Sequence, residues 1–414
     1  MVLIKRDLFE KIKAHLNKKE ITFIVGPRQC GKTTLMWLLI EEIKKQNKPW
    51  IFLSLDFEKD KVFFESQEKF IKKLNLEFGN TPAFVFIDEI QRKENAGLFL
   101  KGIYDRNLPY KFIVSGSGSV ELKAKVHESL AGRKRIFFLS TVSLKEFINF
   151  KTGYKYGNHL KEFFEIHSDS YELILEYLNF GGYPRVVLED TFSEKLAVIH
   201  EIYTSYVEKD LSYWLKIEKP EVFTSLLKIL SHQSGKLTSF TELSNTLGIS
   251  VPTLKTYLYY AEKTYILKKV SPFFRNIKKE LTKTPVYYFC DLGLRNFSAG
   301  VFGKIEDFSE AGFPFQNLVM LLLEERFGET GGVLHYWRSK DGAEVDFVID
   351  FKKEIVPVEV KASFLKKSAI SRSLRSFIKK YAPKEAWIVN LSLKKEVKID
   401  KTLIKIFPIW KLLV

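Results

Sequence analysis

The sequence has little cysteine and no long apolar run. Only two of its 414 residues are cysteines, Cys30 and Cys290, which excludes a disulfide framework, and neither has the neighbours of a zinc site. No apolar stretch approaches the roughly 18 residues of a membrane span. Residues 1–20 also lack the apolar segment of a signal peptide. We therefore expect a cytoplasmic protein with no membrane partner.

Acidic residues are scarce toward the C-terminal end. The formal net charge is +16, and residues 351–414 hold 16 Lys or Arg against 5 Asp or Glu, a net charge of +11. A basic block favours a partner with a phosphate backbone, and we predict nucleic acid as that partner. The alternative is a lysine-rich surface that is merely solvated.

With 414 residues the chain should form about two to four domains, and its 45% of apolar residues are enough to bury their cores. Strand-like runs alternate with helical patterns over the first 150 residues. This alternation is typical of an α/β fold in which helices wrap a parallel sheet. The predicted strands are residues 21–25, 50–55, 83–87, 112–115 and 135–139.

A phosphate-binding loop follows the first of these strands. Residues 26–33 read G-P-R-Q-C-G-K-T and precede a helical pattern, which is the setting that a P-loop requires. Gly26 and Gly31 let the backbone curl so that successive N–H groups point at phosphate oxygens. Lys32 would neutralise the β- and γ-phosphates, and Thr33 would offer a hydroxyl to Mg²⁺. We predict ATP and Mg²⁺ as cofactors, bound by Gly26, Pro27, Arg28, Gln29, Cys30, Gly31, Lys32, Thr33 and Thr34.

Two acids end the strand predicted at residues 83–87. In phosphoryl-transfer sites one acid holds the metal and another group orients the attacking water. We assign Asp88 to Mg²⁺ binding and Glu89 to general-base catalysis. Lys32 is also predicted to be a catalytic residue. An apolar strand that ends in Asp-Glu is weak evidence alone, but it follows a P-loop here.

Two further candidates are Ser117 and Arg133. The strand at 112–115 runs into Ser115-Gly116-Ser117, which would place a hydroxyl at the carboxyl edge of the sheet, where α/β folds bind ligands. Ser117 or Ser115 could sense the γ-phosphate, although a plain turn explains them equally well. Arg133 could act as an arginine finger from a neighbouring subunit. The alternative is an ordinary surface arginine.

The middle of the chain is helical. From residue 149 to 234 the pattern is helical and aromatic, interrupted by a turn at Gly181-Gly182-Tyr183-Pro184. Residues 239–247 and 252–262 then predict two helices around a tight turn, and a strand is expected at 265–270. This pattern indicates a helix-turn-helix followed by a wing.

The second of these helices is poor in basic residues. We expect it to expose Thr253, Lys255, Thr256 and Tyr257, of which only one is basic. Packing against a neighbouring domain is therefore as good an interpretation as insertion into a DNA groove.

The C-terminal part carries a second constellation. Asp346 lies in one predicted strand, and Glu359 and Lys361 lie on one face of the next. If the two strands pair as a hairpin, the three side chains meet. Two carboxylates could then hold Mg²⁺ while Lys361 activates a water for attack on a phosphodiester. The alternative is an ion-pair cluster in a domain that only binds.

Together these motifs resemble a large group of archaeal and bacterial AAA-like ATPases fused to a C-terminal domain of unknown function. The resemblance implies an AAA-type core at 1–150, a helical lid at 151–234, a winged helix at 235–285 and a C-terminal domain similar to restriction-endonuclease-like nucleases at 286–414. It also supports Ser117 as a sensor and Arg133 as a finger, and hence a homo-oligomer. One departure is Gln316, where the similar proteins are expected to have a Glu. The resemblance to this group rests on residues 26–29, 31–34, 88–91, 115–117 and 130–133.

We predict the first of three functions and keep the other two as alternatives. The first is an ATP-hydrolysing switch or motor that acts on nucleic acid through the basic C-terminal domain. The second is an ATP-dependent metal nuclease that uses Asp346, Glu359 and Lys361. The third is a nucleotide-gated scaffold without catalysis in its C-terminal part, which binds protein partners.

Overall fold

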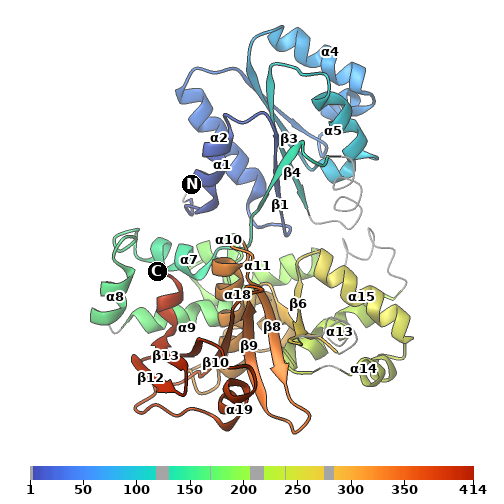
Figure 1. The fold of residues 1–414 in the computed structure, drawn as a ribbon. Helices are drawn as coiled ribbons and strands as arrows, with labels where there is room; N and C mark the ends of the chain where they lie inside the picture. Colours follow the sequence, from blue (N-terminus) through green and yellow to red (C-terminus); the bar gives the residue numbers. More distant parts are fainter. Residues whose placement is uncertain (1–2, 118–129, 168, 206–218, 238, 275–283) are drawn as a thin grey trace. The chain divides into compact units, whose positions relative to one another are not determined.

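The computed structural model describes residues 3–117, 130–167, 169–205, 219–237, 239–274 and 284–414 (Figure 1). The chain forms two compact units. The first contains residues 1–142 and 263–265, and the second contains 143–262 and 266–414. We describe each unit by itself.

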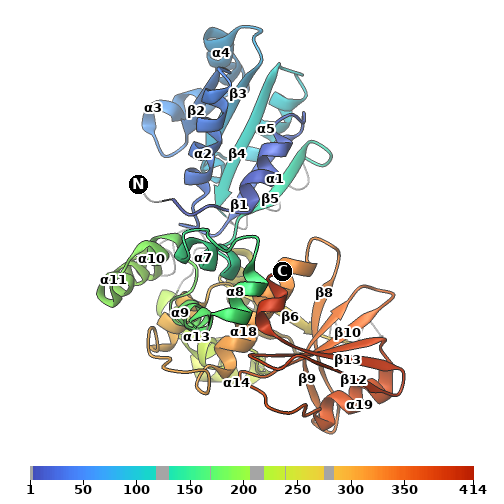
Figure 2. The same cartoon turned by 90° about the vertical axis from the view of Figure 1, so that its left-hand side faces the viewer.

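The first unit is built on a five-stranded sheet in the order β2-β3-β4-β1-β5 (Figure 2). Every strand pair is parallel, and all five predicted strands are present, which confirms the α/β prediction. The strands are β1 Ile21–Gly26, β2 Trp50–Ser54, β3 Ala83–Asp88, β4 Tyr110–Ser117 and β5 Lys134–Phe138. The helices are α1 Leu8–His15, α2 Lys32–Lys45, α3 Glu58–Lys61, α4 Gln67–Phe78 and α5 Ala96–Tyr104, with 3₁₀ turns at Val62–Phe64 and Ile90–Arg92.

Helices cover both faces of this sheet (Figure 1). α4 and α5 pack on one face through Phe70 and Phe99, and α1 and α2 pack on the other through Ile12 and Leu39. A parallel strand covered on both sides reads as a continuous apolar run, and all six residues of β3 are buried. Asp88 therefore lies at the end of β3 as a buried carboxylate at the carboxyl edge of the sheet.

The second unit begins with helices. The predicted turn separates α9 from α10, and the Gly182 N–H in this turn donates to Asp291 Oδ2 at 2.9 Å. The helices before residue 267 are α7 Leu144–Lys151, α8 Leu160–Ile166, α9 Ser170–Phe180, α10 Pro184–Leu188, α11 Phe192–Ile202, α13 Pro220–His232, α14 Phe240–Leu247 and α15 Val251–Lys263. Those after residue 289 are α17 Leu292–Ala299, α18 Gly312–Phe327 and α19 Arg372–Tyr381, and a 3₁₀ turn spans Ile409–Leu412.

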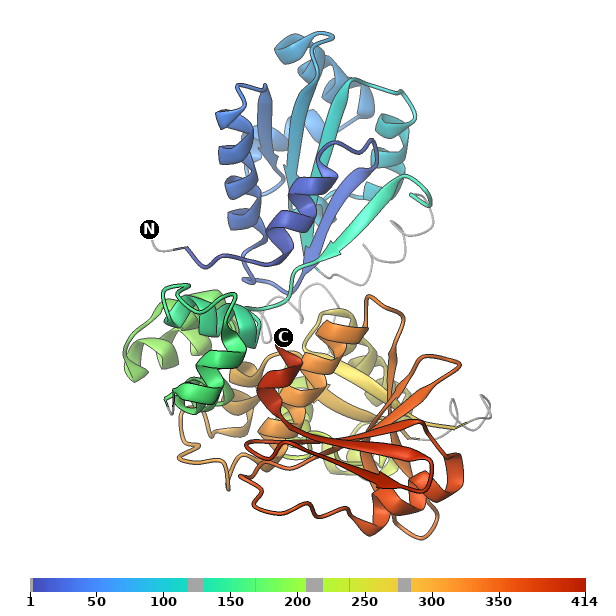
Figure 3. The ribbon, with the colours of Figure 1, turned by 60° about the vertical axis from the view of Figure 1, so that its left-hand side comes forward.

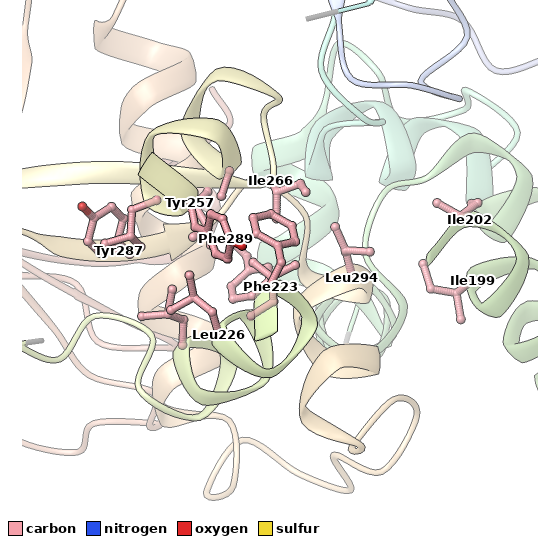
Figure 4. Close-up of a cluster of buried hydrophobic side chains, with 14 of the residues drawn as sticks. Ile199, Ile202, Phe223, Leu226, Tyr257, Ile266, Tyr287, Phe289 and Leu294 are labelled. Atoms are coloured by element: carbon pink, nitrogen blue, oxygen red, sulfur yellow. The ribbon is translucent and has the colours of Figure 1, made fainter. Parts of the chain in front are cut away.

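The predicted helix-turn-helix is present as α14 and α15, joined through Gly248 in a left-handed conformation. One part of the prediction is wrong, because Tyr257 is buried rather than exposed. Leu254, Tyr257, Leu258 and Ala261 recur at helical spacing and face a core shared with α13 (Figure 4). Lys255 and Thr256 remain exposed on the opposite face.

The second unit also holds an eight-stranded sheet in the order β12-β13-β11-β10-β9-β8-β6-β7. Its later strands are the orange and red arrows of Figure 3. β6 pairs with β7 in an antiparallel ladder, as a wing would, but it also joins β8 through Ser271 and Pro272. The strands are β6 Leu267–Pro272, β7 Val286–Phe289, β8 Val333–Arg338, β9 Glu344–Asp350, β10 Ile355–Val360, β11 Glu385–Asn390, β12 Lys395–Ile399 and β13 Thr402–Pro408. The winged helix and the nuclease-like domain stay predictions, as does the division into four segments.

Gly181 allows a close approach between two backbone segments of the second unit. It follows α9 with φ 70° and ψ −159°, and a Cβ there would lie 2.2 Å from the Gly293 nitrogen. Gly300, which follows α17 with φ 73°, has open space where its Cβ would be. Both sites disfavour an L side chain, but only Gly181 adds a steric clash.

We predict that Gly181→Ala destabilises the protein much more than Gly300→Ala. The Gly300 variant should lose about 1 to 2 kcal/mol from left-handed strain alone. The Gly181 variant should lose about 1 to 3 kcal/mol more, because the backbone of α17 must move. Urea unfolding of both variants measures the difference, and equal losses would contradict the prediction.

Candidate functional site

The predicted phosphate loop connects β1 to α2. Gly26 ends β1, and a Cβ there would lie 2.0 Å from the Leu139 carbonyl oxygen, so only glycine fits without a shift of the backbone. Gln29 and Gly31 have φ values of 56° and 96°, and they turn the chain into α2. Arg28 and the fully buried Cys30 complete the loop.

Lys32 is the buried cation of the loop. It begins α2 and is 5% exposed, and its Nζ donates to the Gly26 and Pro27 carbonyl oxygens at 3.3 and 2.6 Å. The ammonium group is therefore held over the loop itself. Thr34 follows Thr33 in the first turn of α2.

Asp88 lies between two hydroxyl groups. Thr33 Oγ1 donates to Asp88 Oδ2 at 2.8 Å, and Ser115 Oγ donates to Asp88 Oδ1. The structure thus brings together the two predicted Mg²⁺ ligands, although they come from α2 and β3. A carboxylate and a hydroxyl are hard oxygen donors, and Mg²⁺ is commonly bound by one or two carboxylates together with phosphates and water. The donor set fits this ion.

Glu89 follows Asp88 in a left-handed conformation, with φ 56° and ψ 41°. Its N–H donates to Ser115 Oγ at 3.3 Å, which ties this backbone to β4. Burial raises the pKa of Glu89, while the Lys32 ammonium opposes the shift and the Asp88 carboxylate adds to it. A carboxyl group with a raised pKa close to a phosphate site is a reasonable candidate for a general base.

Gln91 is a residue of this site to which the sequence analysis gave no role. Its Nε2 donates to the Glu89 carboxylate and, at 2.8 Å, to Ser117 Oγ. Its Oε1 accepts a hydrogen bond from the Ser117 N–H at 3.1 Å. In the sequence, Gln91 was marked only by its position three residues after Asp88. That position does not show which side chains Gln91 contacts.

Ser117 and Arg133 lie at opposite ends of the strands, Ser117 at the carboxyl end of β4 and Arg133 at the amino end of β5. Ser117 ends β4 and is in register with Gly26, so it lies beside the phosphate loop. Arg133 precedes β5, and its carbonyl accepts from Ile21 at the start of β1. The length of β1, six residues, separates the two ends of the strands by about 20 Å. Arg133 therefore does not reach the phosphate loop of its own subunit.

The Arg133 guanidinium has an acidic partner. Its Nε donates to Asp105 Oδ1 at 2.6 Å, and this hydrogen bond raises the pKa of Arg133 and lowers that of Asp105. The role of Arg133 as a finger toward a second subunit stays a prediction.

The second constellation also comes together. β9 and β10 pair in an antiparallel ladder that ends with Phe347 opposite Val358, the residues next to Asp346 and Glu359. Lys361 Nζ lies 2.7 Å from Glu359 Oε1, and Ser371 Oγ donates to Glu359 Oε2 at 2.7 Å. The predicted hairpin is confirmed.

The carboxylate oxygens of Asp346 are also bonded within the protein. Gln316 Nε2 donates to Asp346 Oδ1 at 3.0 Å and to the Tyr288 hydroxyl at 3.2 Å, and the Val360 N–H donates to Asp346 Oδ2 at 2.7 Å. Gln316 thus stands where the resemblance implies an acid. In the part of the chain that the structure describes, no three His, Cys, Asp or Glu side chains form a group that could hold a metal ion.

Family models match most of the chain in three pieces. Residues 18–148 match the model of an AAA domain. This AAA domain contains the phosphate loop, Asp88, Glu89 and Ser117. Residues 171–304 and 311–412 match models that are each described as a domain of unknown function.

Similar proteins extend over most of the chain. An uncharacterized protein of Mycobacterium tuberculosis and one of Mycobacterium bovis are each 25% identical over 385 residues, covering 91% of this chain and 77% of the relative. An uncharacterized protein of Methanocaldococcus jannaschii is 24% identical over 374 residues, covering 84% and 77%.

Solved structures resemble the chain only loosely. A replication initiator DnaA bound to AMPPCP and single-stranded DNA gives a TM-score of 0.32 at 16% identity, covering 63% of this chain and 90% of that one. A Saccharomyces cerevisiae Hsp104:casein complex gives 0.31 at 14% identity, covering 59% and 48%. At these scores the likeness carries no argument about function.

Among the described residues, no helix is both long and apolar enough to cross a membrane.

The burial of Asp346 has a consequence for the pH dependence of stability. Burial raises the pKa of Asp346 from 3.8 to about 7, and the Val360 N–H opposes this shift. Between these two pH values the folded protein binds a proton that the unfolded chain does not. This carboxyl group therefore stabilises the fold less as pH rises from about 4 to 7, and its contribution levels off above that.

We predict that Asp346→Asn removes this trend, because an amide does not titrate in this range. The melting temperature of the variant relative to wild type should rise between pH 4 and pH 8. Asp350→Asn controls for the loss of a carboxylate on the same strand. A difference between variant and wild type that does not change with pH would contradict the prediction.

Proposed function

We propose that the AAA domain binds and hydrolyses ATP, and that the second unit uses the resulting change to act on nucleic acid. The observation that carries the first part is the Thr33–Asp88–Ser115 arrangement, with Lys32 and Glu89 beside it. A loop that only capped a helix would not require a buried carboxylate held by two hydroxyls.

Each residue has a distinct role in this proposal. Lys32 exchanges its two loop carbonyls for β- and γ-phosphate oxygens. Thr33 and Asp88 would hold Mg²⁺, whose positive charge would offset the charge that develops on the phosphate oxygens. Glu89 orients the attacking water and accepts its proton. Ser117 contacts the γ-phosphate from the end of β4.

Arg133 is proposed to act across a subunit boundary. Its guanidinium would have to leave Asp105 and reach the γ-phosphate of a neighbouring copy. The proposal therefore includes a homo-oligomer.

We predict that two substitutions separate binding from hydrolysis. Lys32→Ala should lose nucleotide affinity and turnover together. Glu89→Gln should keep affinity and lose turnover by about 100-fold or more, because only the proton acceptor is removed. Titration with a fluorescent ATP analogue and steady-state phosphate release measure the two quantities. Unaltered turnover in both variants would remove the ATPase assignment.

The nucleic-acid part of the proposal is supported by a basic stretch next to β10. Between Glu359 and Glu385 the chain has eight Lys or Arg and no Asp or Glu. Seven of these eight are exposed, all but Lys361, and five of the seven are Lys366, Lys367, Arg372, Arg375 and Lys379. We call these five residues the basic face.

The basic face fits a polyanion better than a membrane. α19 carries three of its residues, and the apolar side of α19 is buried against the sheet through Leu374, Phe377 and Ile378. A helix that binds a membrane surface needs its apolar side free to enter the lipid. α19 offers only charge, which suits the phosphates of nucleic acid.

We favour binding over cleavage at the neighbouring carboxylates. Each oxygen of Asp346 and Glu359 has a donor or a cation from the protein, and Gln316 stands in place of an acid. The nuclease alternative would require these contacts to open. Cleavage of DNA in Mg²⁺ or Mn²⁺ by wild type, but not by Asp346→Ala, would establish it.

We predict that Arg372→Glu with Arg375→Glu weakens binding to duplex DNA. The slope of log affinity against log salt should fall by about 2, because two phosphate contacts are lost. Lys398→Glu with Lys401→Glu makes the same charge change at exposed residues outside the basic face. Fluorescence anisotropy over a salt series measures both.

Three results would change this part of the proposal. Equal weakening by both pairs would reject the basic face as the contact. Salt-independent binding of a protein partner without DNA affinity would favour the scaffold. Binding to anionic vesicles but not to DNA would place a membrane surface on this face.

A further inference from the structure

Two residues of the proposed ATP site are joined by a third side chain. Gln91 lies in the 3₁₀ turn after β3, and its carboxamide contacts both Glu89 and Ser117. Its nitrogen donates to the Glu89 carboxylate and to the Ser117 hydroxyl, and its oxygen accepts the Ser117 N–H. Nothing in the ATP chemistry described above uses Gln91.

The bridge can have only one orientation. The backbone N–H of Ser117 is a donor and never an acceptor, so the atom of Gln91 that faces it must be the carbonyl oxygen. A flipped amide would place nitrogen against this N–H and oxygen against the Glu89 carboxylate. The hydrogen-bond pattern therefore fixes the Gln91 nitrogen toward Glu89.

Both ends of the bridge rest on ordered backbone. Ile90 is fully buried in the sheet core and anchors the turn that carries Gln91. Glu89 is held by its N–H bond to Ser115, and Ser117 is in register with Gly26 at the phosphate loop. The carboxylate of Glu89 is thus connected to the strand end beside the loop through Gln91.

We propose that Gln91 is a positioning residue that holds the Glu89 carboxylate toward the attacking water and couples it to Ser117. The inference rests on the proposed ATPase function. When the Ser117 hydroxyl donates to a γ-phosphate oxygen, its lone pairs still accept from Gln91, so the bridge persists in the loaded site. Gln91 exchanges no proton and contacts no reacting atom.

The opposite interpretation is that Gln91 slows ATP hydrolysis. In that case the bridge would draw Glu89 away from the water, and its removal would raise turnover. The two readings differ in the sign of one measurement, which decides between them.

The experiment compares two substitutions of Gln91 in the full chain. Gln91→Leu is similar in size and removes all three hydrogen bonds. Gln91→Glu keeps an acceptor for the Ser117 N–H but replaces the donor to Glu89 with a second carboxylate. We expect kcat to fall on the order of 10- to 100-fold in both variants, part of the contribution typical of a general base. The Kd for Mg·ATP should stay within about threefold, because neither variant alters the phosphate loop.

Gln67→Leu is the matched control. Gln67 lies at the start of α4 in the same unit, and its Nε2 donates to the Leu98 and Phe99 carbonyls. This variant loses backbone-directed hydrogen bonds without touching the ATP site, so its kcat should equal that of wild type. Melting temperatures of all variants show whether the fold is retained.

Several outcomes would overturn the inference. A wild-type kcat in both Gln91 variants would show that the bridge does not contribute to turnover. A raised kcat would show that the bridge slows turnover. A parallel loss of affinity, or an equal loss in Gln67→Leu, would make the effect structural. These outcomes differ from failure of the proposed function itself, in which wild type and Glu89→Gln would show no difference in turnover.

Discussion

The buried carboxylate of Asp88 is the constraint on which the N-terminal unit depends. Its two oxygens accept hydrogen bonds from Thr33 and Ser115, so it joins the start of α2 to the ends of β3 and β4. A buried charge without partners is costly, so this carboxylate requires all three elements to be in place.

Much of this unit could be predicted from the sequence, because its signals are local. The glycines, Lys32 and Thr33 are adjacent along the chain, and strands buried on both faces appear as apolar runs. Gln91 could not be assigned in this way. Its contact with Ser117, which is 26 residues away, forms only through the pairing of β3 with β4.

The second unit was harder to predict for the same reason. The helix-turn-helix was correct in its spacing, but Tyr257 was expected on the exposed face and instead packs into the core. Asp346, Glu359 and Lys361 were correctly placed together, since a hairpin brings neighbouring strands into register. Their partners Gln316 and Ser371 come from α18 and the start of α19, and these contacts change a pair of apparent metal ligands into a closed hydrogen-bonded group.

The pairing of β6 with β8 has a consequence for how the C-terminal part can exist alone. A fragment beginning at residue 286 would lack β6 and leave one long side of β8 without its neighbour. β8 carries Leu334, Tyr336 and Trp337, all buried in the intact protein. An exposed apolar edge strand pairs readily with other chains. The basic C-terminal part therefore depends on β6 to cover this edge, and β6 and the C-terminal strands are best regarded as parts of one folding unit.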